Sequence, residues 1–189
     1  MKSVVIFASG SGTNAENIIQ CLHQKRLLVT RIYCNNSQAG IIEKAERLHI
    51  PICMISKADW KERNDSNWQV QLTNDNPDLI VLAGFLWKIP EYLINQFPDK
   101  IINLHPSLLP KYGGKGMYGL NVHKAVIENK ELTTGITIHW VNAEYDEGGI
   151  LFQAEMYVSP SKNPEDLAER IHKLEHAHFP DVIRQVLHC

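Results

Sequence analysis

Short apolar runs alternate with helix-like stretches through the first half of the chain. Apolar residues recur three or four positions apart over Asn14–Leu22 and Ile41–Leu48, which predicts two helices. The run Asp78–Ala83 is almost wholly apolar, as is typical of a parallel strand that is buried on both faces. Strands that alternate with helices predict right-handed βαβ units in a doubly wound α/β fold with a mostly parallel sheet. The predicted strands of this half are Ser3–Ala8, Leu27–Cys34, Pro51–Ile55, Asp78–Ala83 and Lys100–Leu104.

The second half has a different pattern of apolar and polar positions. Thr134–Val141 alternates between them, and Ile150–Val158 follows after a short connection, so we expect an antiparallel strand pair that extends the sheet near the C-terminus. Pro164–Leu187 has apolar residues at helical spacing, with a break expected near Pro180 because proline lacks the N–H of a helical hydrogen bond. The segment Lys57–Asn76 is polar and carries no clear signature.

Length and charge exclude several classes of protein. A chain of 189 residues is long enough for one domain with a sizeable core, and we expect a single domain over 1–189. The formal net charge of −2 gives no basic excess for nucleic acid, and no apolar run approaches the roughly 18 residues of a membrane span. The first residues lack the charged and apolar regions of a signal peptide. We therefore expect a cytoplasmic monomer or homodimer whose partners are small molecules.

The four cysteines are scattered along the chain. They form no C-x-x-C pair and lack the spacing of zinc ligands, so no metal site is expected. Cys21, Cys34 and Cys53 lie in apolar surroundings and are predicted to be small core residues.

The stretch Phe7–Ala15, "FASGSGTNA", leads from the first predicted strand into the first helix. Its glycines satisfy G-x-G-x-x-A, the pattern of dinucleotide-binding loops. Such a site normally has an acidic residue about 20 positions later that holds the ribose, and no Asp or Glu occurs between Arg31 and Ile42, which weighs against NAD. Two interpretations stay open: a tight turn whose Thr13 or Asn14 caps the helix, and a site for one phosphate on free backbone N–H groups.

Asn103 and His105 stand two positions apart at the end of a predicted strand, in "NLHPSLLP", so their side chains share one face. In open α/β sheets, ligands bind beyond the carboxyl ends of the strands. An amide N–H donor beside a protonated imidazole would stabilise a developing oxyanion. The alternative is structural: His105 satisfies a loop carbonyl and Asn103 caps a turn.

The turn Glu144–Gly149 lies between the last two predicted strands and carries three carboxylates. Such a turn is usually a solvated hairpin. A carboxylate placed near His105 would instead favour the imidazolium and raise the pKa of His105. His139 lies within the alternating strand, where we expect a satisfied core histidine.

Four motifs together resemble the glycinamide ribonucleotide formyltransferases, the folate-dependent formyl transfer enzymes of purine synthesis. They are "SGSGTN" in the opening loop, "VLAGF" at Val81–Phe85, "NLHPSLLPKY", and "DEGGILFQ" at Asp146–Gln153. The resemblance extends to the Glu175-His176 pair and covers nearly the whole chain. It implies a Rossmann-like formyltransferase fold, with a phosphate-binding half over 1–100 and a catalytic and folate-binding half over 101–189.

The resemblance also implies roles for individual residues. Asn103, His105 and Asp146 match the catalytic triad, in which Asn103 and protonated His105 stabilise the oxyanion, His105 donates a proton and Asp146 raises the pKa of the imidazole. The residues that match the substrate phosphate loop and the ribose carboxylate are Gly12, Thr13, Asn14 and Glu175. The expected reaction moves the formyl group of 10-formyltetrahydrofolate, the co-substrate, to the amine of glycinamide ribonucleotide, and requires no metal.

The folate pocket implied by the resemblance is formed by the segment 86–89 and closed by the turn 143–146. Its expected residues are Leu86, Trp87, Lys88, Ile89, Asn103, Glu144 and Asp146. Many relatives have Met-Arg-Ile-Leu where this chain has Leu-Trp-Lys-Ile, a departure that puts a tryptophan in the folate site. Lys61 lies near a folate-contacting arginine of the family, and His123 aligns with a family histidine. The Gly-rich stretch Lys111–His123 is expected to form a lid over bound substrates.

Other functions compete with this one. Methionyl-tRNA formyltransferase would add a nucleic-acid-binding C-terminal domain, formyltetrahydrofolate hydrolase would add an N-terminal regulatory domain, and a sugar-amine formyltransferase would not need the phosphate loop. A nucleotide-binding redox protein has only the glycine pattern in its favour, and a noncatalytic binding module would keep the pocket without turnover. The sequence therefore favours formyl transfer to glycinamide ribonucleotide.

Overall fold

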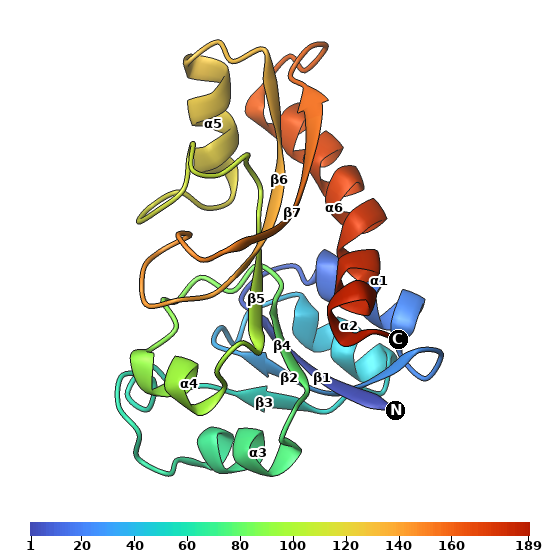
Figure 1. Cartoon of the computed structure of the whole chain (residues 1–189), viewed down its shortest axis with the longest axis vertical. Helices are drawn as coiled ribbons and strands as arrows, with labels where there is room; N and C mark the ends of the chain where they lie inside the picture. Colours follow the sequence, from blue (N-terminus) through green and yellow to red (C-terminus); the bar gives the residue numbers. More distant parts are fainter.

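The apolar runs of the first half pair as five parallel strands, from one edge of a seven-stranded sheet to its middle (Figure 1). The computed structural model describes all of residues 1–189. Its strands are β1 (Lys2–Ala8), β2 (Leu27–Cys34), β3 (Ile52–Met54), β4 (Leu79–Leu82), β5 (Ile101–His105), β6 (Thr133–Trp140) and β7 (Ile150–Tyr157). The strand order is β3-β2-β1-β4-β5-β6-β7, with parallel pairing as far as β5 and antiparallel pairing of β6 with β5 and with β7. The predicted fold class is confirmed.

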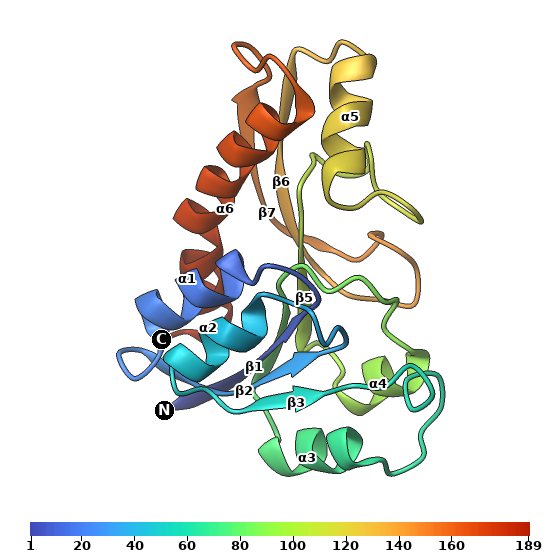
Figure 2. The ribbon, with the colours of Figure 1, turned by 180° about the vertical axis from the view of Figure 1, so that it is seen from behind.

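Six helices connect and cover the strands. They are α1 (Thr13–Leu22), α2 (Ile41–Arg47), α3 (Asn67–Asp75), α4 (Glu91–Gln96), α5 (Leu120–Glu128) and α6 (Pro164–Leu187). Figure 2 shows α1, α2 and α6 along one side of the sheet, where α1 packs against both of the others. None of the six combines the length and the apolar character needed to cross a bilayer.

The central strand β1 is buried on both faces, and its alternate residues belong to two different core clusters. Val4 and Ile6 pack in the larger cluster, which includes the inner faces of α1 and α6. Val5 and Phe7 pack in a smaller cluster that includes Trp60 and residues of α3 and α4. Because both faces of β1 are covered, its carboxyl end is fixed, and the loop that follows it is held at one edge of the sheet.

Three helices were not predicted from the sequence. α3 lies within the polar segment 57–76, α4 follows Pro90, and α5 begins at Leu120. α5 includes the last four residues, 120–123, of the stretch Lys111–His123 for which a lid is predicted.

The predicted break in the C-terminal helix is wrong, because α6 runs without interruption through Pro180. Phe179, Val182 and Ile183 are buried on the same stretch, and α6 packs against α1, α5 and β6. Each buried large apolar side chain contributes about 1.5–3 kcal/mol, so this packing outweighs the hydrogen bond that Pro180 cannot make.

The prediction for the cysteines is confirmed for Cys34 and Cys53, which are buried, and is wrong for Cys21, which is exposed. The buried face of α1 consists of Ala15, Ile18, Ile19 and Leu22. Cys21 lies outside this stripe, so its apolar neighbours in sequence do not surround it in the fold.

Candidate active site

A cavity of about 330 Å³ lies beyond the carboxyl ends of β4 and β5. A second cavity of about 630 Å³ adjoins it and shares the wall formed by Leu86–Ile89 and by Glu144 and Tyr145. Among the predicted site residues, those that line the first cavity are Asn14, Leu86, Trp87, Lys88, Ile89, Asn103, His105, Glu144, Asp146 and Glu175. Gly12 and Thr13 do not line it. The structure therefore brings together most of the residues that the sequence singled out.

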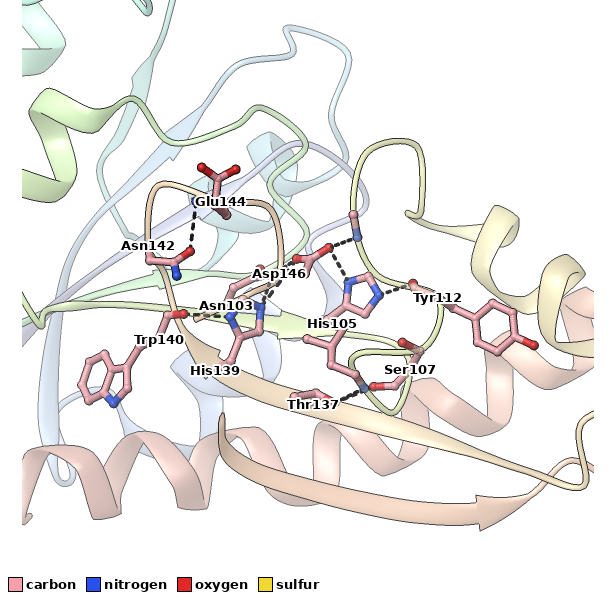
Figure 3. Close-up of polar contacts among 12 residues, drawn as sticks. Asn103, His105, Ser107, Tyr112, Thr137, His139, Trp140, Asn142, Glu144 and Asp146 are labelled. Carbon is pink, nitrogen blue, oxygen red and sulfur yellow. Dashed lines mark hydrogen bonds and ion pairs between the residues drawn. The ribbon is translucent and has the colours of Figure 1, made fainter. Parts of the chain in front are cut away.

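The pairing of β5 with β6 sets the centre of this site. Asn103 and His105 share one face of β5, as their spacing predicted, and the antiparallel register places Asn103 opposite His139 and His105 opposite Thr137. Figure 3 shows Asn103, His105, His139 and Asp146 directed toward one another. The register thus adds a second histidine to the predicted constellation.

The turn between β6 and β7 returns Asp146 to the histidines instead of leaving it in solvent. A Cβ at Gly148 would lie 1.6 Å from the carbonyl oxygen of Trp140, so only glycine allows this close approach. Oδ2 of Asp146 accepts a hydrogen bond from the N–H of Gly114 at 2.8 Å, and the Asp146 side chain is only 13% exposed. The alternative of a solvated hairpin therefore does not hold for Asp146.

Asp146 contacts both histidines. Its Oδ2 lies 3.6 Å from Nδ1 of His105, and its Oδ1 lies 3.6 Å from Nε2 of His139 (Figure 3). Burial alone would raise the pKa of Asp146, but its contacts with His139, with His105 and with the N–H of Gly114 together hold that pKa below its ordinary value. The carboxyl group is therefore ionised at neutral pH.

His139 is the site residue whose role the sequence did not predict. Its Nδ1 donates to the carbonyl oxygen of Trp140 at 2.8 Å, which leaves Nε2 to accept from Nδ2 of Asn103 at 3.1 Å. It is a satisfied, buried histidine, as expected, but it also orients the Asn103 amide. The only sequence signal was its place in an alternating strand, which does not give the register with β5.

His105 is buried at the end of β5, and its Nε2–H donates to the carbonyl oxygen of Tyr112 at 2.8 Å. His105 therefore also makes the hydrogen bond to a loop carbonyl that its structural interpretation predicted. The other ring nitrogen, Nδ1, faces Asp146. Burial lowers the pKa of His105, and this effect exceeds the opposing charge of Asp146. The role of a protonated His105 at the oxyanion stays a prediction.

The opening loop forms a tight turn, but neither Thr13 nor Asn14 caps α1. Gly12 is the N-cap, with φ of +72° and no side-chain cap bond. A Cβ at Gly12 would lie 2.5 Å from Cδ1 of Ile41, so both conformation and space require glycine here. The backbone N–H groups of Thr13, Asn14 and Ala15 make no hydrogen bond within the protein. They form the kind of helix N-terminus that binds a phosphate.

The side chain of Asn14 joins the loop to α6. Its Nδ2 donates to Oε2 of Glu175 at 2.7 Å, and Glu175 is only 5% exposed. Burial raises the pKa of Glu175, while the hydrogen bond from Asn14 and the charge of His172 act in the opposite direction. Asn14 and Glu175 thus place a polar pair at one end of the cavity.

The segment 86–89 and the 142–146 turn form the opposite end. The ammonium of Lys88 lies 5.2 Å from the centre of the Tyr145 ring, so the two walls touch through a cation–π contact. Residues 114–119 of the predicted lid also line the cavity, whereas Lys61 lines only the adjoining one. No group of three or more His, Cys, Asp or Glu side chains is arranged to hold a metal ion.

His123 lines the same cavity from α5 and is 4% exposed, with no partner for its Nδ1. Burial lowers its pKa to about 4, helped by the charges of His172 and His105. The unfolded chain takes up a proton near pH 6.5, well before the folded protein does. Stability is therefore complete above that pH and falls as the pH drops from 6.5 toward 4.

We expect His123 to cost the protein roughly 2 kcal/mol of unfolding free energy between pH 7 and pH 5. Urea unfolding of the wild type and of His123→Gln at both pH values measures this contribution. The two proteins differ only at position 123, so the smaller loss of unfolding free energy in His123→Gln isolates the contribution of His123. Equal losses of unfolding free energy in the two proteins would contradict this role of His123.

The sequence profile of the family described as Formyl transferase matches residues 1–183. The chain is 37% identical to chloroplastic phosphoribosylglycinamide formyltransferase of Arabidopsis thaliana, covering 96% of this chain and 64% of that relative. It is 34% identical to phosphoribosylglycinamide formyltransferase of Bacillus subtilis strain 168, covering 99% of this chain and 95% of the relative. The chain thus spans less than two thirds of the plant relative.

Solved structures resemble the whole fold. Glycinamide ribonucleotide transformylase 1 of Geobacillus kaustophilus superposes with a TM-score of 0.88 at 32% identity and covers 99% of both chains. Phosphoribosylglycinamide formyltransferase of Bacillus halodurans superposes with a TM-score of 0.86, also at 32% identity, over 98% of this chain and 95% of that one. With the profile match over nearly its full length, the chain belongs to the formyl transferase family.

Proposed function

We propose that the chain transfers the formyl group of 10-formyltetrahydrofolate to the amine of glycinamide ribonucleotide, in de novo purine synthesis. The observation that carries the proposal is the Asn103–His105–Asp146 constellation between two differently built ends of one cavity. One end has Asn14, in the first turn of α1, with Glu175, and the free N–H groups of that turn lie beside it; the other end has the apolar and aromatic segment 86–89. Relatives named for this activity support the proposal. The reaction is assigned to a cytoplasmic monomer or homodimer.

The acceptor binds at the α1 end. Its phosphate accepts hydrogen bonds from the backbone of the loop at Gly12, Thr13 and Asn14, where the helix dipole also favours negative charge. Glu175 accepts from the ribose hydroxyls. The carboxylate is already held by Asn14, so it is oriented before the substrate arrives.

The folate binds at the other end, between the segment 86–89 and the turn that carries Glu144 and Asp146. The adjoining cavity gives room for the part of the folate that extends beyond the reacting centre. In the proposed binding mode, N10 and its formyl group lie near Asn103, His105 and Asp146.

His105 moves the proton. In the proposed reaction Nδ1, which faces Asp146, begins unprotonated and accepts the proton that the amine loses as nitrogen attacks the formyl carbon. The charged Asp146 stabilises the imidazolium formed in this step. The C–N10 bond then breaks, the carbonyl reforms, and N10 takes the proton from Nδ1. The products are the formamide and tetrahydrofolate, and His105 is neutral again.

Asn103 stabilises the oxyanion of the tetrahedral intermediate. One N–H of its amide is held by His139, and the other makes only a long contact of 3.5 Å with Oδ1 of Asp146. The second N–H is therefore available to the oxyanion, and the first fixes the plane of the amide.

A formyl-transfer assay tests the proposal. Purified protein is mixed with 10-formyltetrahydrofolate and glycinamide ribonucleotide, and loss of the formyl group is followed by absorbance. We expect turnover that requires the ribonucleotide and weakens strongly when the acceptor lacks its phosphate. Turnover without any acceptor would indicate a hydrolase, and no consumption of the formyl folate would contradict the proposal.

A further inference from the structure

The polar segment 57–66, which has no sequence signature, forms an irregular but well-anchored loop between β3 and α3. Its anchor is Gln69, which is 7% exposed at the start of α3. The Gln69 side chain accepts from the backbone N–H groups of Asn64 and Asp65 and donates to the carbonyl oxygens of Asp59 and Glu62. A buried amide that closes both ends of a loop fixes the residues between them.

The loop places Trp60 against the segment 86–89, which forms a wall shared by the two cavities. Trp60 is 6% exposed, and its Nε1–H donates to the carbonyl oxygen of Lys88 at 2.9 Å. Its ring centre lies 5.6 Å from that of Trp87 and 5.2 Å from that of Phe85. Trp60 thus contacts two successive residues of the segment 86–89, and it also lines the adjoining cavity.

The segment 86–89 depends on such contacts because it belongs to no helix or strand. None of its backbone groups takes part in a backbone–backbone hydrogen bond. Two side chains hold it instead: Oγ of Ser9 accepts from the N–H of Leu86, and Trp60 donates to Lys88. Apart from packing, the position of the later half of the segment rests on Trp60.

We propose that Trp60 is a positioning residue for the folate: it sets the position of Trp87 and Lys88 and so the width of the pocket. The inference rests on the proposed function, because it assigns the segment 86–89 to the folate. Trp60 acts through the backbone of Lys88 and the ring of Trp87. Its loss should therefore affect binding of the folate and leave the acceptor end unchanged.

The test compares Trp60→Phe with the matched variant Trp68→Phe. Trp68 is 2% exposed and lies 5.3 Å from Trp60 in the same aromatic cluster, but its Nε1 has no hydrogen-bond partner. Both variants remove one indole from the core, so both destabilise the fold. Only Trp60→Phe removes a donor from the cavity wall.

We expect Trp60→Phe to raise KM for 10-formyltetrahydrofolate about three- to tenfold, the ratio that corresponds to one hydrogen bond. KM for the ribonucleotide and kcat should stay close to the wild type, and Trp68→Phe should change none of the three constants substantially. Circular dichroism confirms that both variants are folded. Equal folate KM values in the two variants, in an active enzyme, would overturn the inference and leave the proposed function intact.

Limited proteolysis gives a readout that does not need turnover. Tryptic cleavage after Lys88, measured by mass spectrometry on the ligand-free protein, should be faster in Trp60→Phe than in Trp68→Phe. An inactive wild type would refute the proposed function and the folate assignment, while this difference in cleavage rate would still show whether Trp60 holds the segment. Equal cleavage rates in the two variants would overturn the positioning role itself.

Discussion

Asp146→Asn is expected to lower kcat for formyl transfer by about 10³-fold or more, the loss typical when a carboxylate beside a catalytic imidazole is made neutral. Asp146 lies 3.6 Å from each histidine and accepts the Gly114 N–H. An amide of the same shape keeps the space filled but cannot stabilise an imidazolium. The pKa of His105 should fall further, because Asp146 is the group that opposes the effect of burial. Steady-state kinetics with both substrates saturating measures the loss.

The control is Glu147→Gln, which removes a carboxylate from the next position of the same turn. Glu147 is exposed and does not line the cavity. Its kcat should stay close to that of the wild type, which separates the local effect of Asp146 from a change in net charge. If Asp146→Asn is folded and retains nearly full kcat, the proposed proton path through His105 is wrong.

The fold was largely predictable because its strongest signals are local. Asp78–Ala83 is almost wholly apolar, which is typical of a parallel strand covered on both faces, and β4 is buried at every position. The shared face of Asn103 and His105 follows from the period of a strand, and the edge at which they lie follows from the topology of an open α/β sheet. The elements and the first two site residues could therefore be derived from the chain alone.

What the sequence could not provide depends on distant partners. His139 enters the site through the register of β5 with β6, which a single sequence does not specify. Trp60 reaches Lys88 across 28 positions, from a loop whose polar composition gave no pattern. The resting charge of His105 is a balance between burial and Asp146, and only the fold determines how deeply the ring is buried. α6 likewise tolerates Pro180 because of tertiary packing.

His105→Ala is expected to lower kcat by about 10³-fold, within the range for loss of a positioned acid–base group. Of the two histidines that contact Asp146, His105 is the one whose Nδ1 is free to take a proton, since Nδ1 of His139 is held by the carbonyl of Trp140. The substitution also removes the hydrogen bond to the carbonyl of Tyr112, so the loop that contains Tyr112 loses one link to β5. Kinetics alone would not separate this loosening from the loss of proton transfer.

Chemical rescue separates the two effects. Free imidazole can enter the space left by the ring and carry a proton, but it cannot restore the link between β5 and Tyr112. We expect added imidazole to raise kcat of His105→Ala with a dependence on the concentration of its neutral form, and to leave Asp146→Asn unchanged. Rescue that follows the imidazolium form instead would mean that His105 begins the reaction protonated. A folded His105→Ala with kcat close to the wild type would remove His105 from the chemistry, and Asp146 would then have to act on the substrates directly.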